Sequence, residues 1–411
     1  GIIAEMYDSC DDSDALDAEG QILCPGFVDL HIHGSFGRDV LEPGGTAHLR
    51  RHLPSVGTTS FCPTNATDTF EHIHSFLAEV KQEMAGQSGT RILGAHIEGP
   101  FFALDNRGAH AIPLLQDPTM ENYQKMVGGH EDVIVRVSVA PEKPGGMELV
   151  SYLAKKGIVV SAAHTDSMAK EMEEAISKGV SIATHTFNGF YPVHHRQENS
   201  IGVVLTDDRI ICEFIPDLQH INVYAARLIM KAKGFEKTFI CSDALEPSQM
   251  GDGIFSLAGS KVIVKDSVAR LEDGRLAGST ICVLQGVRNL VNIMKIPLCK
   301  ALRLGTYNPA NAIGNAHIGR IAVGAAAQPD AYPRQTGIQP GVNRPCSNAK
   351  RAGEFAPALF MPLPKQQKKD ANAASFFVYP VSSWPALRLC SSLPEPLPAA
   401  YHSRPWPRLW I

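Results

Sequence analysis

This sequence of 411 residues lacks the cysteine spacing that would indicate a disulfide framework or a zinc knuckle. Its nine cysteines are scattered singly, at positions 10, 24, 62, 212, 241, 282, 299, 346 and 390. The sequence also lacks a charged-then-apolar signal segment at its start and any apolar run long enough to span a bilayer. These absences favour a reducing, cytoplasmic location and give no indication of a membrane partner.

An excess of charge of either sign is also missing. The sequence has 38 Lys and Arg against 42 Asp and Glu, which gives a formal net charge of -4. Because the positive and negative charges are nearly equal in number, there is no electrostatic reason to expect nucleic acid as a partner. We therefore expect the chain to act on a small molecule.

The sequence does contain a repeated alternation of short β-branched runs, polar loops and helical stretches whose apolar period is near four. This alternation predicts βα units and a parallel sheet. Eight such units close a TIM barrel, so the expected fold class is α/β with a TIM (β/α)8 barrel. The candidate strands are 22–29, 58–62, 92–97, 133–139, 158–162, 180–184, 210–214 and 239–242.

The composition changes near the end of the chain. Residues 328–411 hold 14 of the 28 prolines and all three tryptophans, but only four of the 42 acidic residues. Because proline lacks a backbone donor and restricts its neighbour, runs such as 391–398 sustain neither a helix nor a central strand. We interpret 328–411 as a separate, Pro-rich and disordered tail.

Reactive side chains follow the candidate strands at the ends where a TIM barrel carries its functional groups. The first strand ends in Asp29-Leu-His31-Ile-His33, where strand alternation points both imidazoles to one side. Further strand ends carry, in chain order, His96 with Glu98, His164, His185 and Asp243. One His-Xaa-His pair is often only a surface or hydrogen-bonded pair, but five such strand ends in one barrel indicate a shared metal.

Imidazole and carboxylate ligands suit Zn²⁺, Fe²⁺, Co²⁺ or Mn²⁺. An ion held by Glu98, His164 and His185, with an open position for water, would lower that water's pKa and create a nucleophile near neutral pH. Asp243 could take the proton during attack on an amide carbonyl and return it to the departing nitrogen. A purely structural alternative is that Asp243 caps the helix after its strand.

Four motifs stand in order over roughly residues 20–320: PGFVDLHIHG (25–34), HIEGPF with RGAH (96–101 and 107–110), AAHTDS with THTFNGFYPVHHR (162–167 and 184–196), and SDA with LAGST (242–244 and 276–280). In order and spacing they resemble the N-acetylglucosamine-6-phosphate deacetylase family of the amidohydrolase superfamily. The resemblance implies hydrolysis of the N-acetyl amide of a phosphorylated amino sugar, with one or two divalent ions. The family is also commonly homodimeric.

The resemblance assigns a role to each matching position. It implies Glu98, His164 and His185 as primary metal ligands and Asp243 as the catalytic acid/base. His31 and His33 would support a second ion, as in some family members. The implied substrate contacts are Ala109, Asn188, Gly189, Arg196, His220, Leu276, Ala277 and Gly278.

Two of these implied contacts suit a phosphate group. Arg196 offers a bidentate guanidinium fork, and His220 offers a further donor. The alternative is that Arg196 belongs to a surface ion pair and that His220 is a loop histidine without a ligand. Family members often have Ala where this chain has Gly189, a small departure because backbone groups bind there.

Both ends of the chain depart from the family pattern, in which a small β-sandwich flanks the barrel. We expect residues 1–21 to be a remnant of that domain, 22–318 the barrel, and 319–327 the start of a return to the small domain. The family pattern then stops, as a shifted reading frame or an alternative exon would produce. The β-sandwich is therefore expected to be incomplete, which affects stability more than chemistry.

Two other functions remain open from the sequence. A dihydroorotase-like, D-aminoacylase-like or adenosine-deaminase-like amidohydrolase would share the metal residues. Ring-opening members usually add a carbamylated lysine after the fourth strand, whereas here that strand is followed by Ala140-Pro-Glu, with Lys143 beyond it. The other alternative is a catalytically inactive scaffold, although nothing structural demands Glu98, His164, His185 and Asp243 together.

Overall fold

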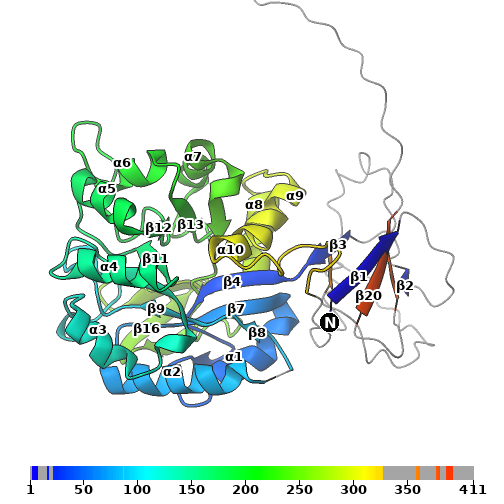
Figure 1. The fold of residues 1–411 in the computed structure, drawn as a ribbon, viewed down its shortest axis with the longest axis horizontal. Helices are drawn as coiled ribbons and strands as arrows, with labels where there is room; N and C mark the ends of the chain where they lie inside the picture. Colours follow the sequence, from blue (N-terminus) through cyan, green and yellow to red (C-terminus); the bar gives the residue numbers. More distant parts are fainter. Residues whose placement is uncertain are drawn as a thin grey trace, which may run out of the picture.

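The computed structural model describes residues 2–7, 16–17, 22–86 and 88–326, and the backbone of three later strands at 358–361, 376–379 and 386–391. Eight parallel strands form its centre, and helices surround them (Figure 1). The spatial order of these strands follows the chain. They are β4 (Phe27–Ile32), β7 (Thr58–Asn65), β9 (Ala95–Glu98), β10 (Ile134–Val139), β11 (Val159–Ala162), β12 (Val180–Ala183), β13 (Ile211–Phe214) and β14 (Thr238–Ile240).

The barrel is nearly closed by contacts between its first strand and the segment that follows its last. The amide of Asp243 donates to the carbonyl of His31 at 2.9 Å, and the amide of His33 donates to the carbonyl of Ala244 at 2.9 Å. These contacts bring the first and last functional strand ends together, although they lie more than two hundred residues apart. The predicted α/β TIM barrel is confirmed.

The first predicted strand, 22–29, is divided into two. β3 (Ile22–Pro25) lies outside the barrel, and β4 begins after Gly26. A Cβ atom at Gly26 would lie 2.2 Å from the side chain of Thr59, so glycine allows the chain to pass close to β7 at this point. The third predicted strand is likewise divided, into β8 (Arg91–Ile92) and β9.

The barrel helices begin and end at residues suited to those positions. The side chains of Thr69, Thr119 and Asn222 accept hydrogen bonds from the first turns of α2, α3 and α7. No helix in the described part of the chain is long and apolar enough to cross a membrane. The helices are α1 (Gly45–His52), α2 (Phe70–Met84), α3 (Met120–Val127), α4 (Gly146–Lys155), α5 (Ala169–Lys178), α6 (Ser200–Thr206), α7 (Val223–Lys233), α8 (Val283–Asn292), α9 (Leu298–Leu304) and α10 (Tyr307–Ala312).

Strand alternation divides apolar from polar side chains on the barrel strands. On β10, Val137 and Val139 pack in the main hydrophobic core with the helices, while Arg136 and Ser138 are buried among polar partners. On β13, Glu213 likewise alternates with core residues. A fully buried polar layer therefore lies inside the barrel.

A small antiparallel sheet that was not predicted from the sequence follows β14. It consists of β15 (Gly253–Leu257), β16 (Ser260–Lys265) and β17 (Val268–Leu271). One face of the sheet packs through Val262, Val264 and Ala269 against Leu245 and Ala277. This packing places the segment after β17 beside the end of β14. A further short hairpin joins β5 (Gly34–Ser35) to β6 (Arg38–Asp39).

Three short strands of the tail pair with the N-terminal strands. β20 (Ala386–Ser391) runs parallel to β1 (Ile2–Tyr7), β19 (Phe376–Tyr379) pairs with β20 and with β2 (Leu16–Asp17), and β18 (Ala358–Met361) pairs with β3. The rest of 327–411 lies outside the described residues. The domain boundaries, and the interpretation of 328–411 as a foreign or disordered tail, stay predictions.

We expect limited proteolysis to cleave the tail early and to leave the barrel intact. Its proline-rich, acid-poor composition predicts backbone that opens at little free-energy cost. Mass spectrometry of the products should show cuts after residue 327. Protection of the tail to its end, with blue-shifted fluorescence of Trp384, Trp406 and Trp410 that is lost cooperatively on unfolding, would contradict this expectation.

Candidate metal centre and substrate pocket

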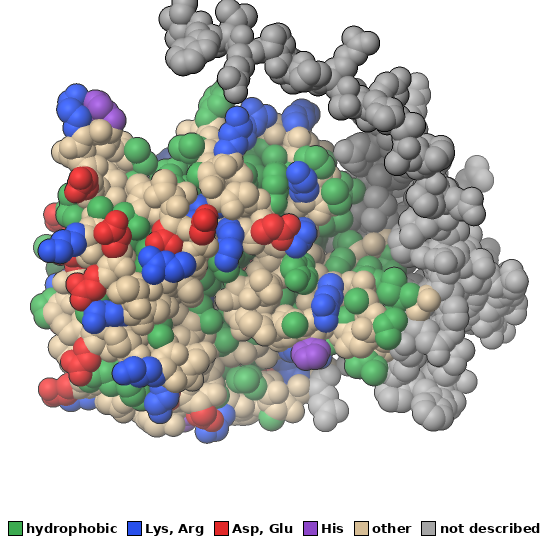
Figure 2. Space-filling model, turned by 45° about the horizontal axis from the view of Figure 1, so that its top comes forward, with side chains coloured by type: hydrophobic (Ala, Val, Ile, Leu, Met, Phe, Trp, Pro, Cys, Tyr) green, Lys and Arg blue, Asp and Glu red, His purple; other side chains and the backbone are tan. Residues whose placement is uncertain are grey.

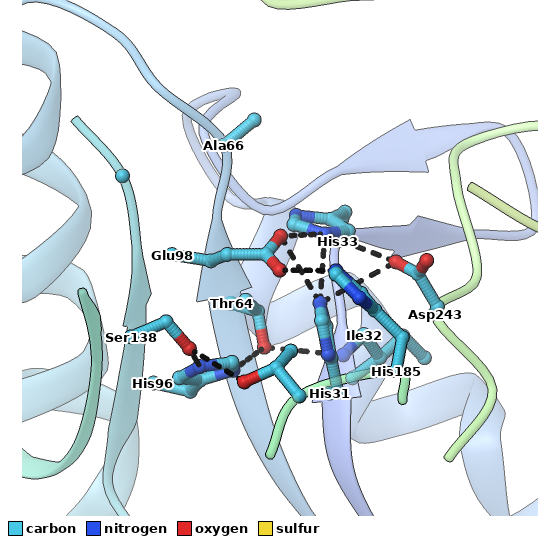
Figure 3. A network of polar contacts seen from close by, with 12 residues as sticks. His31, Ile32, His33, Thr64, Ala66, His96, Glu98, Ser138, His185 and Asp243 are labelled. Atoms are coloured by element: carbon cyan, nitrogen blue, oxygen red, sulfur yellow. Dashed lines mark hydrogen bonds and ion pairs between the residues drawn. The ribbon is translucent and has the colours of Figure 1, made fainter. Parts of the chain in front are cut away.

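The predicted functional side chains meet at one end of the barrel (Figure 3). Three of them have positive φ angles that residues other than glycine rarely adopt: 45° at His164, 29° at His185 and 48° at Asp243. Each lies just after a barrel strand, where the chain turns away from the sheet. Strained backbone of this kind is concentrated at functional sites, because the surrounding fold must hold it in place.

One group consists of the three predicted primary metal ligands. The Nε2 atoms of His164 and His185 lie 3.1 Å apart. Oε1 of Glu98 lies 3.2 Å from His185 Nε2 and 3.8 Å from His164 Nε2. On the far side of each ring, Nδ1 lies 2.9 Å from the carbonyl oxygen of Asn106 for His164 and 3.0 Å from that of Asn188 for His185.

These carbonyl contacts determine where the imidazole protons lie. A carbonyl oxygen only accepts, so Nδ1 of each ring is the donor and Nε2 of each neutral ring carries a lone pair. Burial, followed by the neighbouring His185, lowers the pKa of His164 to about 4, so His164 is neutral near pH 7. Lone pairs on His164, His185 and Glu98 therefore converge, and Glu98 Oε1 has no hydrogen-bond partner within the described part of the chain. A divalent cation fits this donor set.

A second group surrounds the other oxygen of Glu98. Oε2 lies 3.1 Å from His31 Nε2 and 3.0 Å from His33 Nε2, and the two Nε2 atoms are 3.2 Å apart. Oδ1 of Asp243 lies 3.4 Å from His31 Nε2 and 3.3 Å from His33 Nε2. Figure 3 shows the Glu98 carboxylate facing His31, His33 and His185, with dashed lines to all three. Its carboxylate is thus shared by two candidate metal positions.

The second group lies in a strongly negative field. Burial lowers the pKa of His33, but the carboxylates of Asp243 and Glu98 outweigh burial and raise this pKa to about 9. The same two carboxylates raise the pKa of His31 well above its usual value, against the effect of burial. Burial raises the pKa of Asp243, but the two histidines hold it below its usual value. Four buried side chains here favour a bound positive charge.

His96, at the same strand end as Glu98, has a different role. Its Nδ1 lies 3.2 Å from the hydroxyl of Thr64, and its Nε2 lies 2.8 Å from the hydroxyl of Ser138. Both ring nitrogens are therefore occupied by hydroxyl groups below the metal centre. His96 belongs to the buried polar layer of the barrel.

His110, in the RGAH motif, is a site residue that the sequence reasoning did not single out. Its Nε2 lies 3.9 Å from Glu98 Oε2, and its Nδ1 lies 2.8 Å from the hydroxyl of Thr67. His110 lies on a long loop and not at a strand end, so its spacing in the sequence did not mark it as a site residue. Its position in the motif was the only available indication.

A cavity of about 270 Å³ opens onto the metal centre. Its lining contains most of the predicted substrate contacts, together with Gly108, His110 and Arg275. The predicted residues in the lining are His33, Glu98, Ala109, His164, His185, Asn188, Gly189, His220, Asp243, Leu276 and Gly278. His31 lies buried beneath, and Ala277 is buried behind its neighbours.

The cationic groups around the cavity are arranged differently from the sequence prediction. Arg196 is exposed on a loop, where its Nη1 lies 2.8 Å from His195 Nε2, and it does not line the cavity. His220 does line the cavity, and its Nδ1 is held 2.7 Å from the carboxylate of Asp217. Arg275, which the sequence reasoning missed, donates to the carbonyl of Gly108 at the cavity wall.

Comparisons with known proteins agree with this geometry. Residues 22–328 match the model of the amidohydrolase family. The chain is 33% identical over 315 residues to N-acetylglucosamine-6-phosphate deacetylase from Lysinibacillus sphaericus, covering 76% of this chain and 81% of the relative. It is 30% identical over 299 residues to N-acetylgalactosamine-6-phosphate deacetylase from Escherichia coli O157:H7, covering 72% and 79%. The crystal structure of N-acetylglucosamine-6-phosphate deacetylase from Pasteurella multocida superposes with a TM-score of 0.73 at 30% identity, covering 78% and 84%.

Proposed function

The chain belongs to the amidohydrolase family, and we propose that it hydrolyses the N-acetyl amide of N-acetylglucosamine 6-phosphate to glucosamine 6-phosphate and acetate. This reaction is a step of amino-sugar catabolism. The observation that carries the proposal is the shared Glu98 carboxylate, with histidine ring nitrogens on either side and Asp243 at the same cavity. Relatives of about 30% identity that are named as deacetylases of such sugars point to the same reaction.

The metal ligands in this proposal come from the two groups around Glu98. Glu98, His164 and His185 would hold the first ion, and His31 and His33 with the other oxygen of Glu98 would hold a second. When bound, a divalent ion supplies an activated water and polarises the amide carbonyl. Zn²⁺, Fe²⁺, Co²⁺ and Mn²⁺ all accept these donors.

Asp243 is the proton carrier in this proposal. Its carboxylate lines the cavity, and His31 and His33 keep its pKa below the usual value despite burial, so it is ionised and able to accept. It takes the proton from the water that attacks the acetyl carbonyl. The same proton then goes to the sugar nitrogen as the C–N bond breaks, which releases acetate and the free amine.

The phosphate would be bound by His220 in the cavity and by Arg196 on a neighbouring exposed loop. His220 lines the cavity, and Asp217 raises its pKa against the effect of burial, which favours a protonated ring. Arg196 follows Asn188 and Gly189 on the same chain segment and carries the bidentate donor that a phosphate suits. We retain both as proposed phosphate contacts.

Replacing Arg196 with alanine should raise KM for the phosphorylated sugar far more than for unphosphorylated N-acetylglucosamine. A charge-assisted pair contributes roughly 1.5–3 kcal/mol, which corresponds to roughly a 10- to 150-fold higher KM. Steady-state kinetics on both sugars measure this difference. Arg209→Ala is a matched control, because Arg209 is an exposed arginine paired with Asp207. An equal loss on both sugars would assign Arg196 to structure.

A second candidate substrate is the galactosamine epimer, because one of the relatives is named for it. The ratio of kcat/KM for the two 6-phosphates decides between them. Ring-opening amidohydrolase chemistry has less support, since Lys143 after β10 is paired with Asp117 at 3.0 Å and does not line the metal cavity. A higher kcat/KM for the gluco epimer is the outcome that the proposal requires.

The remaining assignments concern the surroundings of the protein. We propose a cytoplasmic homodimer without a nucleic acid partner, from the scattered cysteines, the family resemblance and the even charge balance. The face of the barrel in Figure 2 mixes Lys and Arg with Asp and Glu, which fits this proposal. Light scattering at several protein concentrations measures the oligomeric state.

A further inference from the structure

A fully buried ion pair lies directly beneath the second group of metal ligands. Arg136 on β10 and Glu213 on β13 are both inaccessible to solvent, with 2.5 Å between Arg136 Nη1 and Glu213 Oε2. The other guanidinium nitrogens of Arg136 donate to the hydroxyls of Ser161 at 2.6 Å and Thr184 at 2.9 Å. The guanidinium thus fixes Glu213 from one side. A buried ion pair is weak evidence for stability, so its position calls for another explanation.

The other oxygen of Glu213 contacts one residue of each candidate metal group. Oε1 lies 3.1 Å from Nδ1 of His31 and accepts the backbone amide of His185 at 3.2 Å. A carboxylate with two firmly engaged oxygens cannot rotate away from the His31 ring. In the neutral form of the ring, which is the form that binds a metal, Nδ1 of His31 therefore carries the proton and Nε2 keeps a lone pair.

The alternative tautomer of His31 would compete with metal. Nε2 of His31 faces Glu98 at 3.1 Å and Asp243 at 3.4 Å, and both carboxylates accept hydrogen bonds. Without an acceptor at Nδ1, the ring would place its proton on Nε2 and donate it to these carboxylates. That nitrogen would then have no lone pair for an ion. His33 does not replace His31 as a fixed metal ligand, because no acceptor among the described residues holds the proton on Nδ1 of His33.

We infer that Glu213, held by Arg136, is a positioning residue that sets the His31 tautomer and thereby creates the second metal position. The inference rests on the proposed metal-dependent function. Removal of an acceptor behind a metal-binding histidine typically weakens metal binding about 10- to 100-fold. The effect should fall on the second ion, because the rings of His164 and His185 are oriented by backbone carbonyls instead.

The test measures metal binding and needs no substrate. Metal-free protein is titrated with Co²⁺ against a competing chelator, and bound metal per chain is determined by elemental analysis. The unaltered protein should bind two ions. Glu213→Gln should bind the first ion normally and the second about 10- to 100-fold more weakly. Ser138→Ala is a matched control, since Ser138 lies in the same polar layer but contacts His96 and Thr184, and it should bind both ions normally.

A second variant covers the case in which Glu213→Gln fails to fold with Arg136 unpaired. The double variant Arg136→Met with Glu213→Met replaces the whole pair by apolar side chains of similar size, a change that buried ion pairs often tolerate. It should fold, bind the first ion and lose the second. Two ions bound with normal affinity by either folded variant would overturn the inference and leave the proposed function intact. One ion at most in the unaltered protein would also overturn it. No ion at all would remove the proposed function as well.

Discussion

Asp243→Asn should keep the first metal ion and lose nearly all turnover. The amide has the size of the carboxylate but cannot take the proton from water, and general base catalysis typically contributes about 10²- to 10⁴-fold in rate. We therefore expect kcat to fall by about that factor while KM changes little. Kinetics combined with elemental analysis of the same sample measure both properties.

Two results bear on this expectation for Asp243. Asp252→Asn is a suitable control, because Asp252 is an exposed acid that only receives the amides of Asp266 and Ser267. Near-normal turnover by metal-loaded Asp243→Asn would remove Asp243 from the mechanism. The helix-capping role that the sequence left open is excluded in either case, because β15 and not a helix follows Asp243.

Glu98→Gln should have the widest effect on metal content. Each oxygen of Glu98 serves a different candidate position, with Oε1 facing His164 and His185 and Oε2 facing His31 and His33. Glutamine carries no charge and has an NH2 group in place of one of these two oxygens, so both positions lose negative charge and one loses its ligand atom. Bound metal per chain and kcat should therefore fall together. Elemental analysis after reconstitution is the measurement.

The control for Glu98→Gln is Glu79→Gln. The Glu79 carboxylate accepts hydrogen bonds from the backbone amides of Gly44 and Ala47 on the outside of the barrel. The Glu79→Gln variant should bind metal normally. Both variants should retain the circular dichroism spectrum of a folded barrel. Normal metal content in folded Glu98→Gln would show that the carboxylate is not shared between ions.

The catalytically inactive scaffold is the alternative with the least physical support. A structural role does not require His164, His185 and Glu98 to converge their lone pairs, since that arrangement is repulsive without a cation. Burial keeps His164 neutral, so protonation of that ring does not relieve the repulsion near pH 7. A bound ion explains why these three side chains converge, whereas packing alone does not.

The barrel and the ends of its strands were predictable because their signals are local. A β-branched run followed by His, Glu or Asp identifies both the strand and its functional end, and alternation correctly put His31 and His33 on one side. The small antiparallel sheet of β15, β16 and β17 was missed, even though β16 alternates buried and exposed residues. It lay within a stretch already assigned to βα units.

The buried polar layer could not be predicted in the same way. Arg136 and Glu213 are single charged residues within otherwise apolar strands, and either could have faced solvent at a sheet edge. Their pairing depends on the barrel bringing β10 and β13 around a common interior, although Arg136 and Glu213 are 77 positions apart in sequence. Arg275 was missed for a similar reason, since its place at the cavity depends on the packing of the small antiparallel sheet that precedes it.

The most direct test is acetate release from N-acetylglucosamine 6-phosphate by the purified chain, before and after reconstitution with Zn²⁺, Fe²⁺, Co²⁺ or Mn²⁺. The proposed function predicts stoichiometric acetate and glucosamine 6-phosphate that appear only with metal, and loss of this activity in Asp243→Asn. Folded protein with its metal sites filled that releases no acetate from this sugar would contradict it.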